Sequence, residues 1–200
     1  MNKLIILEGA KDMGKTTALV KLADYIHKNG GILLDAFWVP IGRDPNRLPK
    51  YVLQRLSGIT PGGVSANPNL NSTFNISLCI QKKYLQNSNL CMDYVFIFWY
   101  KGEVAIICTG GDNPQLISVG VNLNISISIN INPNIRLCNS NIVCARTKHK
   151  ASSSVFMQTE SVFGSVEREY SLSRNTVFLN GSLDIDRRQS KAVSDIVGLL

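Results

Sequence analysis

Apolar residues in the first part of the chain form two different patterns, a continuous run and a helical spacing. Residues 3–8 enclose a continuous apolar run, which predicts a short buried strand. Residues 17–26 instead place apolar side chains at the three- and four-residue spacing of a helix, and Asn29-Gly30-Gly31 is expected to end that helix. Residues 32–39 predict a second strand. A strand, a helix and a strand in succession favour an α/β fold.

The middle of the chain predicts a β-hairpin. Residues 93–100 and 103–108 are both rich in β-branched and aromatic side chains, and only Lys101-Gly102 separates them. Two runs of this kind joined by a two-residue turn are typical of a hairpin.

A weakly patterned segment over residues 40–92 precedes the hairpin. Its first part is rich in Pro, Gly, Asn and Ser, and short helices are predicted only at 50–56 and 76–86. A stretch of this length in a compact domain is typically functional or disordered. We expect an irregular or substrate-binding excursion here, with disorder as the equal alternative.

The segment that follows the hairpin has two interpretations. Ile alternates with polar residues over 125–131, and this period of two favours a strand. A connection between parallel strands, however, usually contains a crossover helix. We predict a helix for 114–124 and leave 125–133 undecided.

The last elements of the predicted domain are two short strands and a helix. Residues 141–145 and 176–179 predict core strands, and residues 189–200 predict an amphipathic helix that Asp184 or Asp186 caps. The sequence therefore predicts one α/β domain over all 200 residues, with a mostly parallel central sheet flanked by helices and a β-hairpin insertion.

The most specific chemical signal lies between the first strand and the first helix. Gly9-Ala10-Lys11-Asp12-Met13-Gly14-Lys15-Thr16 fits the phosphate-binding pattern G-x-x-x-x-G-K-[ST], and Thr17 continues it into the helix. Glycine lets the backbone approach a polyphosphate, and a helix N-terminus offers N–H donors. Lys15 is expected to reach the β- and γ-phosphates and Thr16 to bind Mg²⁺. The alternative is a glycine turn with an ordinary surface lysine.

A second candidate site follows the strand at 103–108. Thr109-Gly110-Gly111-Asp112 comes at the carboxyl end of that strand, where α/β folds bind ligands. Asp112 is expected to lie beside the Mg²⁺, or else to cap a helix that begins near Pro114. The third strand has no run of four apolar residues followed directly by Asp, and a turn separates Asp112 from it. Asp35, at the end of the second strand, therefore competes for the metal-ligand role.

A third candidate is Arg146, at the end of the strand at 141–145. The following turn, residues 147–154, is basic and rich in hydroxyl groups. It is expected at the same sheet edge as the phosphate-binding loop, where Arg146 would contact the transferred phosphate or a base. The alternative is a solvated basic loop.

Charge and cysteine content narrow the class of protein. A net charge of +7 allows an anionic partner, but no dense Lys/Arg run marks a nucleic-acid surface, so a small molecule is favoured. The five cysteines form no C-x-x-C, which predicts buried free thiols at Cys108 and Cys144. The chain has no signal-peptide core and no apolar stretch of membrane-spanning length, so a cytoplasmic location without a membrane span is expected.

With these motifs the chain resembles the P-loop NTPase superfamily, most of all its small nucleotide-kinase-like members. Residues 4–22 carry the specific part of the resemblance. Thr109–Asp112 and Ile142-Val143-Cys144-Ala145-Arg146 are also similar to a turn and a strand of small, poorly characterised bacterial ATP-binding proteins.

The resemblance implies an ATP- and Mg²⁺-dependent phosphotransferase that moves the γ-phosphoryl group to a small acceptor such as a nucleotide. Lys15, Asp112 and Arg146 would then be the catalytic residues, and residues 9–17 would hold the nucleotide. The alternative is an ATPase subunit that acts through a protein or nucleic-acid partner.

Overall fold

A computed structural model of the chain describes residues 3–40, 92–111, 140–147, 154–179 and 184–200. The helices predicted at 50–56, 76–86 and 114–124 lie outside these residues, as does the undecided segment at 125–133.

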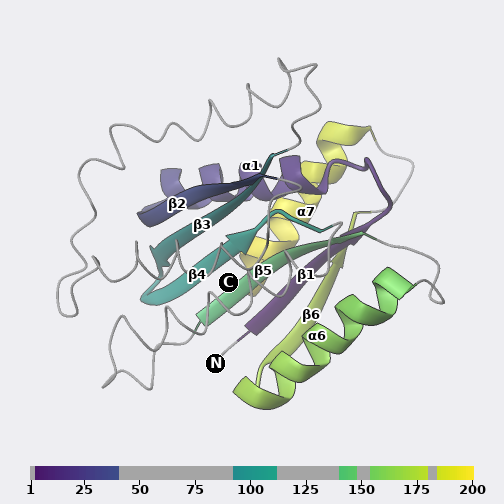
Figure 1. Ribbon diagram of the computed structural model, residues 1–200. Coiled ribbons are helices and arrows are strands. Elements are labelled where there is room, and N and C mark those ends of the chain that lie inside the picture. Colours follow the sequence, from purple (N-terminus) through teal and green to yellow (C-terminus); the bar gives the residue numbers. More distant parts are fainter. Residues whose placement is uncertain (1–2, 41–91, 112–139, 148–153, 180–183) are drawn as a thin grey trace.

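The described residues form six strands and three helices in one sheet-centred unit (Figure 1). In chain order these elements are β1 (Lys3–Gly9), α1 (Lys15–Lys28), β2 (Ile32–Pro40), β3 (Met92–Tyr100), β4 (Glu103–Cys108), β5 (Ser140–Thr147), α6 (Ser154–Tyr170), β6 (Ser173–Phe178) and α7 (Ile185–Leu199).

The six strands pair in the order β2-β3-β4-β5-β1-β6. β1 is parallel to β5 and β6, and β4 is parallel to β5, whereas β3 is antiparallel to both β2 and β4. Five strands therefore run in one direction and β3 runs in the other. The prediction of an α/β fold is confirmed, with a mixed sheet.

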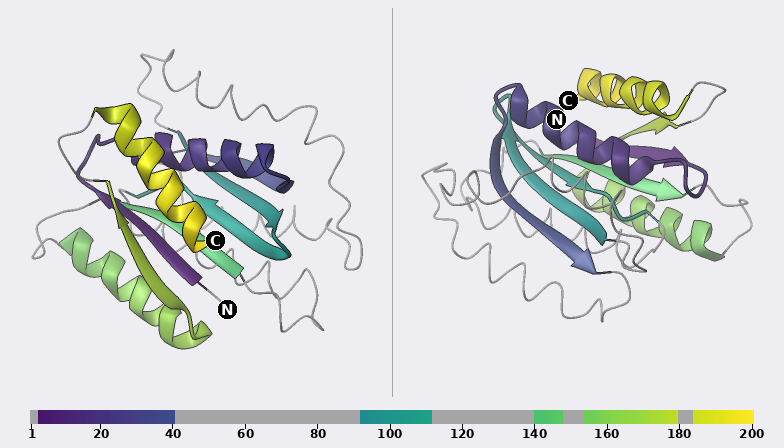
Figure 2. Two further views of the ribbon diagram at one scale, coloured as in Figure 1. Left: turned by 180° about the vertical axis from the view of Figure 1, so that it is seen from behind. Right: turned by 90° about the horizontal axis from the view of Figure 1, so that it is seen from above.

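Helices cover both faces of the sheet (Figure 2). α1 and α7 lie on one face and α6 lies on the other. Ile5 and Leu7 of β1 belong to the core cluster that includes residues of α1 and α7, while Leu4 and Ile6 alternate with them and are also buried. A strand that is buried on both faces needs a continuous apolar run, which is what β1 has. No described helix is long and apolar enough to cross a bilayer.

The elements with the clearest periodicity form as predicted. β1, α1 and β2 follow one another, and the N–H of Gly31 donates to Ile26 O at the end of the helix. β3 and β4 pair as a hairpin in which Lys101 and Gly102 both have positive φ (52° and 79°), the pattern of a type I′ turn.

The helix α6 is the main element that sequence analysis does not predict. Its 17 residues include four Ser and Thr and three Val, which have lower helix propensity, so the helical period is weak. The signal that identifies it is the spacing of Phe156, Thr159, Phe163 and Val166 at three and four residues. Phe163 and Thr159 are indeed buried.

The C-terminal elements begin earlier than predicted. β6 starts at Ser173 instead of residue 176, and α7 starts at Ile185 instead of residue 189. Of the two predicted caps, Asp184 is the one used, because its Oδ1 accepts a hydrogen bond from the Arg187 N–H at 2.9 Å. Asp186 instead forms an ion pair with Lys21 of α1 at 3.0 Å.

Two buried free thiols lie side by side in the sheet. Cys108 of β4 and Cys144 of β5 are paired positions, and neither forms a disulfide, as predicted. The hydrogen bond with Cys108, together with burial, raises the pKa of the Cys144 thiol well above its ordinary value. Both thiols therefore act as small apolar side chains of the sheet.

Candidate functional site

The connections of the sheet change direction at the carboxyl end of β1. From β1 the chain passes through α1 to β2 at one edge of the sheet, and from β5 it passes through α6 to β6 at the other edge. The two helices lie on opposite faces (Figure 2). The strand order therefore reverses between β1 and β5. Open α/β sheets bind their ligands outside the carboxyl ends of the strands at such a point.

The predicted phosphate-binding loop occupies this position, between Gly9 and the start of α1. Its backbone bends sharply, because Asp12 and Gly14 both have left-handed conformations (φ 61° and 84°) and the Met13 N–H approaches Ala10 O at 3.4 Å. Left-handed residues in a short loop form a concave nest that favours anions. Glycine is required at position 14 for a second reason, since an added Cβ would lie 2.4 Å from Gln189 Nε2.

The first turn of α1 opens into the loop. Ala18 is the first helical residue whose N–H meets a backbone carbonyl, that of Gly14, at 2.9 Å. Within the described part of the chain, no backbone carbonyl accepts from the N–H groups of Thr16 and Thr17. These donors and the positive end of the helix dipole suit an anion at the loop.

Lys15 turns back over the same loop. Its side chain is nearly buried (7% exposed), and Nζ donates to the carbonyl of Ala10 at 2.8 Å. The loop thus holds the ammonium group against its own backbone. The loop and the first turn of α1 together supply a positive charge and backbone N–H donors, the two features that suit a phosphate group.

Thr109, at the end of β4, reaches the phosphate-binding loop. Its carbonyl lies 3.5 Å from Thr16 Oγ1, and its own side chain is buried, accepting from Tyr94 N at 2.8 Å and donating to Asp93 Oδ1 at 3.1 Å. Hydrogen bonds with β3 therefore hold Thr109 in place, and its backbone carbonyl lies next to Thr16. The second predicted site and the loop meet here.

The turn after Thr109 lies against the end of β5. The carbonyl of Gly111 accepts from the Thr147 N–H at 3.0 Å, and Thr147 is in turn paired with Gly9. An added Cβ at Gly111 would lie 2.8 Å from the Ala145 carbonyl carbon, so only glycine permits this close approach. Asp112 follows directly but lies outside the described residues, and its role stays a prediction.

Asp35 is not brought to the loop, contrary to its predicted role as a competing metal ligand. β2 continues five residues beyond it, to Pro40. The strand pairings place Asp35 in one row with Ile97, Ile106, Ile142 and Leu4. The row crosses five strands, so about 19 Å, or four inter-strand spacings, separates Asp35 from Leu4, and Leu4 lies five residues before Gly9. Asp35 is therefore remote from Thr16 both along and across the sheet.

Arg146 lies at the predicted edge, but its guanidinium belongs to an ion-pair cluster. Its side chain is 5% exposed, with Nη1 2.5 Å from Glu160 Oε2 and Nε 3.3 Å from Glu8 Oε2. It also lies over the Phe163 ring, 5.9 Å from the centroid. Because Glu160 and Phe163 belong to α6, Arg146 faces away from α1. Residues 148–153 of the basic loop lie outside the described residues, so that alternative and the phosphate contact both stay predictions.

Arg174 of β6 completes this cluster. It shares Glu160 with Arg146 through an ion pair of 2.5 Å and forms a two-pronged contact with Glu167, in which Nη2 is 2.7 Å from Oε2. Burial alone would raise the pKa of the Glu160 carboxyl, but hydrogen bonds from Arg174 and Arg146 outweigh burial and lower it. The cluster thus fastens α6 to β5 and β6.

Sequence analysis does not identify the contribution of α7 to this site. Gln189 is buried (1% exposed), and its Nε2 lies 3.4 Å from the carbonyl of Gly14, while Arg188 Nη1 lies 3.7 Å from Met13 Sδ. The usable signal is that Gln189 shares the buried face of α7 with Ala192 and Ile196. A polar residue at a core position of a helix requires a polar partner.

We predict that Gly14→Ala destabilises the protein more than Gly30→Ala. Both glycines have positive φ (84° and 87°), so each substitution costs about 1–2 kcal/mol of backbone strain. Only at Gly14 does the new methyl group also meet Gln189 Nε2. The free energy of unfolding in urea measures the difference. Combining Gly14→Ala with Gln189→Ala should remove the excess, and equal losses for the two glycines would contradict the close packing.

We predict that Glu160→Gln lowers stability at neutral pH but not in acid. Because the pKa of Glu160 is lowered in the folded protein, ionised Glu160 stabilises it above the unfolded-state pKa. That stabilisation is lost as the pH falls through the folded-state pKa. We expect a loss of about 1 kcal/mol at pH 7, since the side chain is partly exposed, and a progressively smaller loss as the pH falls through the folded-state pKa. Urea unfolding from neutral to acid pH tests it.

The matched control is Asp195→Asn, which removes the exposed ion pair with Lys191 on α7. Little change at either pH is expected for this variant. A Glu160→Gln protein as stable as the wild type at pH 7 would show that the cluster contributes nothing to folding.

Comparison of the chain with known protein families, with curated proteins and with solved structures finds no match. The residues themselves, through their geometry, indicate the candidate function. That geometry joins β1, α1, the end of β4 and the start of α7 around the loop at residues 9–16.

Proposed function

We propose that this chain binds ATP with Mg²⁺ at residues 9–17 and transfers the γ-phosphoryl group to a small acceptor such as a nucleotide. The observation that carries the proposal is the position of Lys15. Its ammonium group lies 2.8 Å from Ala10 O, at the open N-terminus of α1 and at the carboxyl end of an interior parallel strand. This is the arrangement that a polyphosphate requires.

The arrangement around β1 also supports a P-loop NTPase fold. β1 has parallel neighbours on both sides, and the loop that follows it leads directly into a helix packed on the sheet. The strand order reverses next to this loop. A nucleotide would then lie across the carboxyl ends of β1, β5 and β4.

Catalysis by such a site relies on positioning and on neutralising charge. Lys15 would contact the β- and γ-phosphates, and Thr16 Oγ1 would bind Mg²⁺ next to the backbone of Thr109. Mg²⁺ would neutralise the charge that develops during transfer. Asp112 would orient a ligand of that ion. The expected acceptor segment, residues 40–92, lies outside the described residues.

We predict that Lys15→Ala reduces ATP affinity by well over tenfold, because a charge-assisted contact contributes about 1.5–3 kcal/mol. Titration calorimetry with ATP and Mg²⁺ measures the affinity. The matched control is Lys28→Ala, which removes an exposed lysine from the other end of α1 and should leave binding unchanged. Unchanged ATP affinity in a folded Lys15→Ala protein would rule out this phosphate site.

We predict that Asp112→Asn leaves ATP affinity largely intact and slows turnover at least tenfold, because a water or ion that Asp112 orients matters mainly in the transition state. Asp35→Asn, four strands away from β1, should leave turnover unchanged. The assay measures ATP consumption with a panel of nucleotide acceptors. ATP hydrolysis without any phosphorylated acceptor would instead support an ATPase that acts through a partner.

A further inference from the structure

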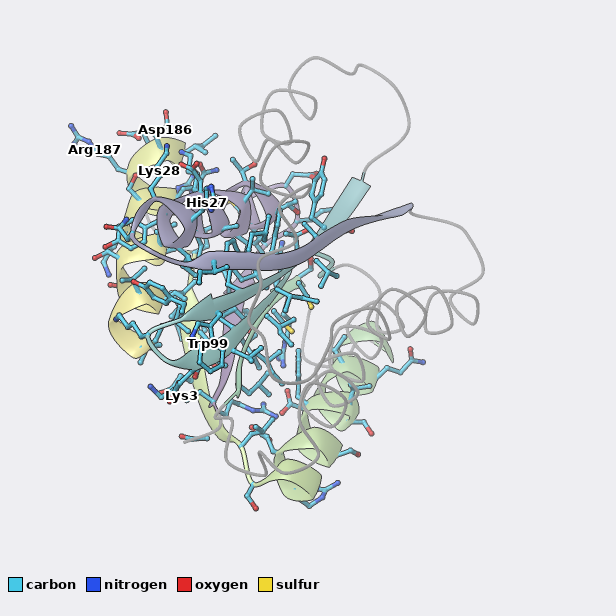
Figure 3. All side chains as sticks on the ribbon, turned by 90° about the vertical axis from the view of Figure 1, so that its left-hand side faces the viewer. Lys3, His27, Lys28, Trp99, Asp186 and Arg187 are labelled. Atoms are coloured by element: carbon cyan, nitrogen blue, oxygen red, sulfur yellow. The ribbon has the colours of Figure 1, made fainter. Side chains whose placement is uncertain are left out.

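The start of β3 lies at the same edge of the sheet as the phosphate-binding loop. β3 is antiparallel to both of its neighbours, so its first residues, and not its last, reach the edge where β1, β4 and β5 end. Figure 3 shows Trp99, near the end of β3, at the same end of the sheet as Lys3, where β1 begins. Asp93 and Tyr94 therefore lie at the other end, beside Thr109.

The pairing of Thr109 with Tyr94 uses a side chain in place of a backbone group. In a hydrogen-bonded antiparallel pair, each residue donates its N–H to the carbonyl of the other. The N–H of Thr109 does so and lies 2.9 Å from Tyr94 O. The N–H of Tyr94, however, donates to the side-chain hydroxyl of Thr109 at 2.8 Å. The hydroxyl thus takes the place of the Thr109 carbonyl in the ladder.

The carbonyl that this hydroxyl replaces faces the first turn of α1. Thr109 O lies 3.5 Å from Thr16 Oγ1. This separation is at the long end for a hydrogen bond, and contacts of this length commonly tighten when a substrate binds. A hydroxyl has one proton and two lone pairs, so a Thr16 hydroxyl that donates to Thr109 O has only its lone pairs to offer a ligand. Lone pairs are what a cation requires.

Asp93 fixes the orientation of the Thr109 hydroxyl. That hydroxyl donates to Asp93 Oδ1 at 3.1 Å, which directs its lone pairs to the Tyr94 N–H. A carboxylate acceptor makes this bond stronger than a bond between two neutral groups. Thr109 is also buried, so water does not compete for its hydroxyl. The contacts therefore continue from β3 through Thr109 to Thr16.

We infer that Thr109 is a positioning residue of the nucleotide site, because its side-chain hydroxyl releases its own carbonyl to orient the Thr16 hydroxyl toward Mg²⁺. This inference rests on the function proposed above. The hydroxyl oxygen of Thr16 fits that ion, since Mg²⁺ prefers oxygen ligands. Without a hydroxyl at position 109, the Tyr94 N–H would need the backbone carbonyl of that residue, as in an ordinary ladder. The carbonyl would then turn away from Thr16.

The test compares Thr109→Val with Thr159→Val. Both substitutions remove the hydroxyl of a buried threonine and keep the shape of its side chain, but Thr159 lies in α6, on the other face of the sheet from α1. Titration calorimetry measures ATP affinity with Mg²⁺ and again with EDTA. For Thr109→Val we expect the affinity with Mg²⁺ to fall about fivefold, as for the loss of one hydrogen bond, and the affinity with EDTA to change less than about twofold. Thr159→Val and Thr109→Ser, which keeps the hydroxyl, should show the Mg²⁺ dependence of the wild type.

The outcomes separate this inference from the proposed function. Wild-type Mg²⁺ dependence in Thr109→Val, or an equal loss of affinity with Mg²⁺ and with EDTA, would overturn the role of Thr109, while loss of ATP binding in Lys15→Ala would leave the phosphate site standing. A wild type that binds ATP equally well with Mg²⁺ and with EDTA would also overturn the inference. If the wild type binds no ATP at all, the proposed function fails and the inference fails with it.

A second pair of variants covers the case in which Thr109→Val does not fold. Thr109→Ala then takes its place, because a smaller side chain lets the backbone carbonyl return to the ladder without crowding. Wild-type Mg²⁺ dependence in Thr109→Ala would overturn the inference. Loss of Mg²⁺ dependence in Thr109→Ser would overturn it too, since that variant keeps the hydroxyl.

Discussion

The structure depends on the parallel pairing of β1 with β5 on one side and with β6 on the other. This pairing makes β1 an interior strand, so its apolar run is buried on both faces. The helices α1 and α7 lie on one face of the sheet, and α6 lies on the other. Parallel strands end at the same edge, which brings Gly9 next to Thr147. Every residue of the candidate site is positioned relative to that edge. A change in this register by one residue would exchange the two faces and separate the loop from its neighbours.

The two faces of the sheet divide the arginines between different tasks. On the α6 face, Arg146 and Arg174 share Glu160 and lie over one aromatic ring, so their charges hold a helix to the sheet. On the other face, Arg188 extends from α7 to the phosphate-binding loop. The charge of Arg146 is met by Glu8 and Glu160. Successive side chains of a strand point to opposite faces of the sheet, and Arg146 is directed to the α6 face.

Much of the fold follows from local sequence, and the exceptions have identifiable causes. β1, α1, β2 and the hairpin have strong periods and explicit turn residues, so their prediction is confirmed. The sequence does not predict α6, because its Ser and Val residues have lower helix propensity and its helical period is weak. In the candidate site, Gly14, Lys15 and Thr16 come together because they are adjacent in the chain. Asp35 lies away from the loop because β2 is the edge strand, and a local sequence pattern does not indicate which strand becomes the edge of the sheet.

The sequence by itself determined the strand, loop and helix at residues 3–28, since spacing, glycine and helix capping act over a few residues. It also determined that Thr109 and Arg146 follow apolar strands. Only the tertiary structure decided that Thr109 lies beside Thr16, that Arg146 faces Glu160, and that Arg188 reaches Met13. These contacts join residues that are 93, 14 and 175 positions apart. The order of the strands and the packing of α7 determine these contacts. Both result from burial of apolar surface. Because that driving force is non-directional, the local sequence does not show which distant residues will meet.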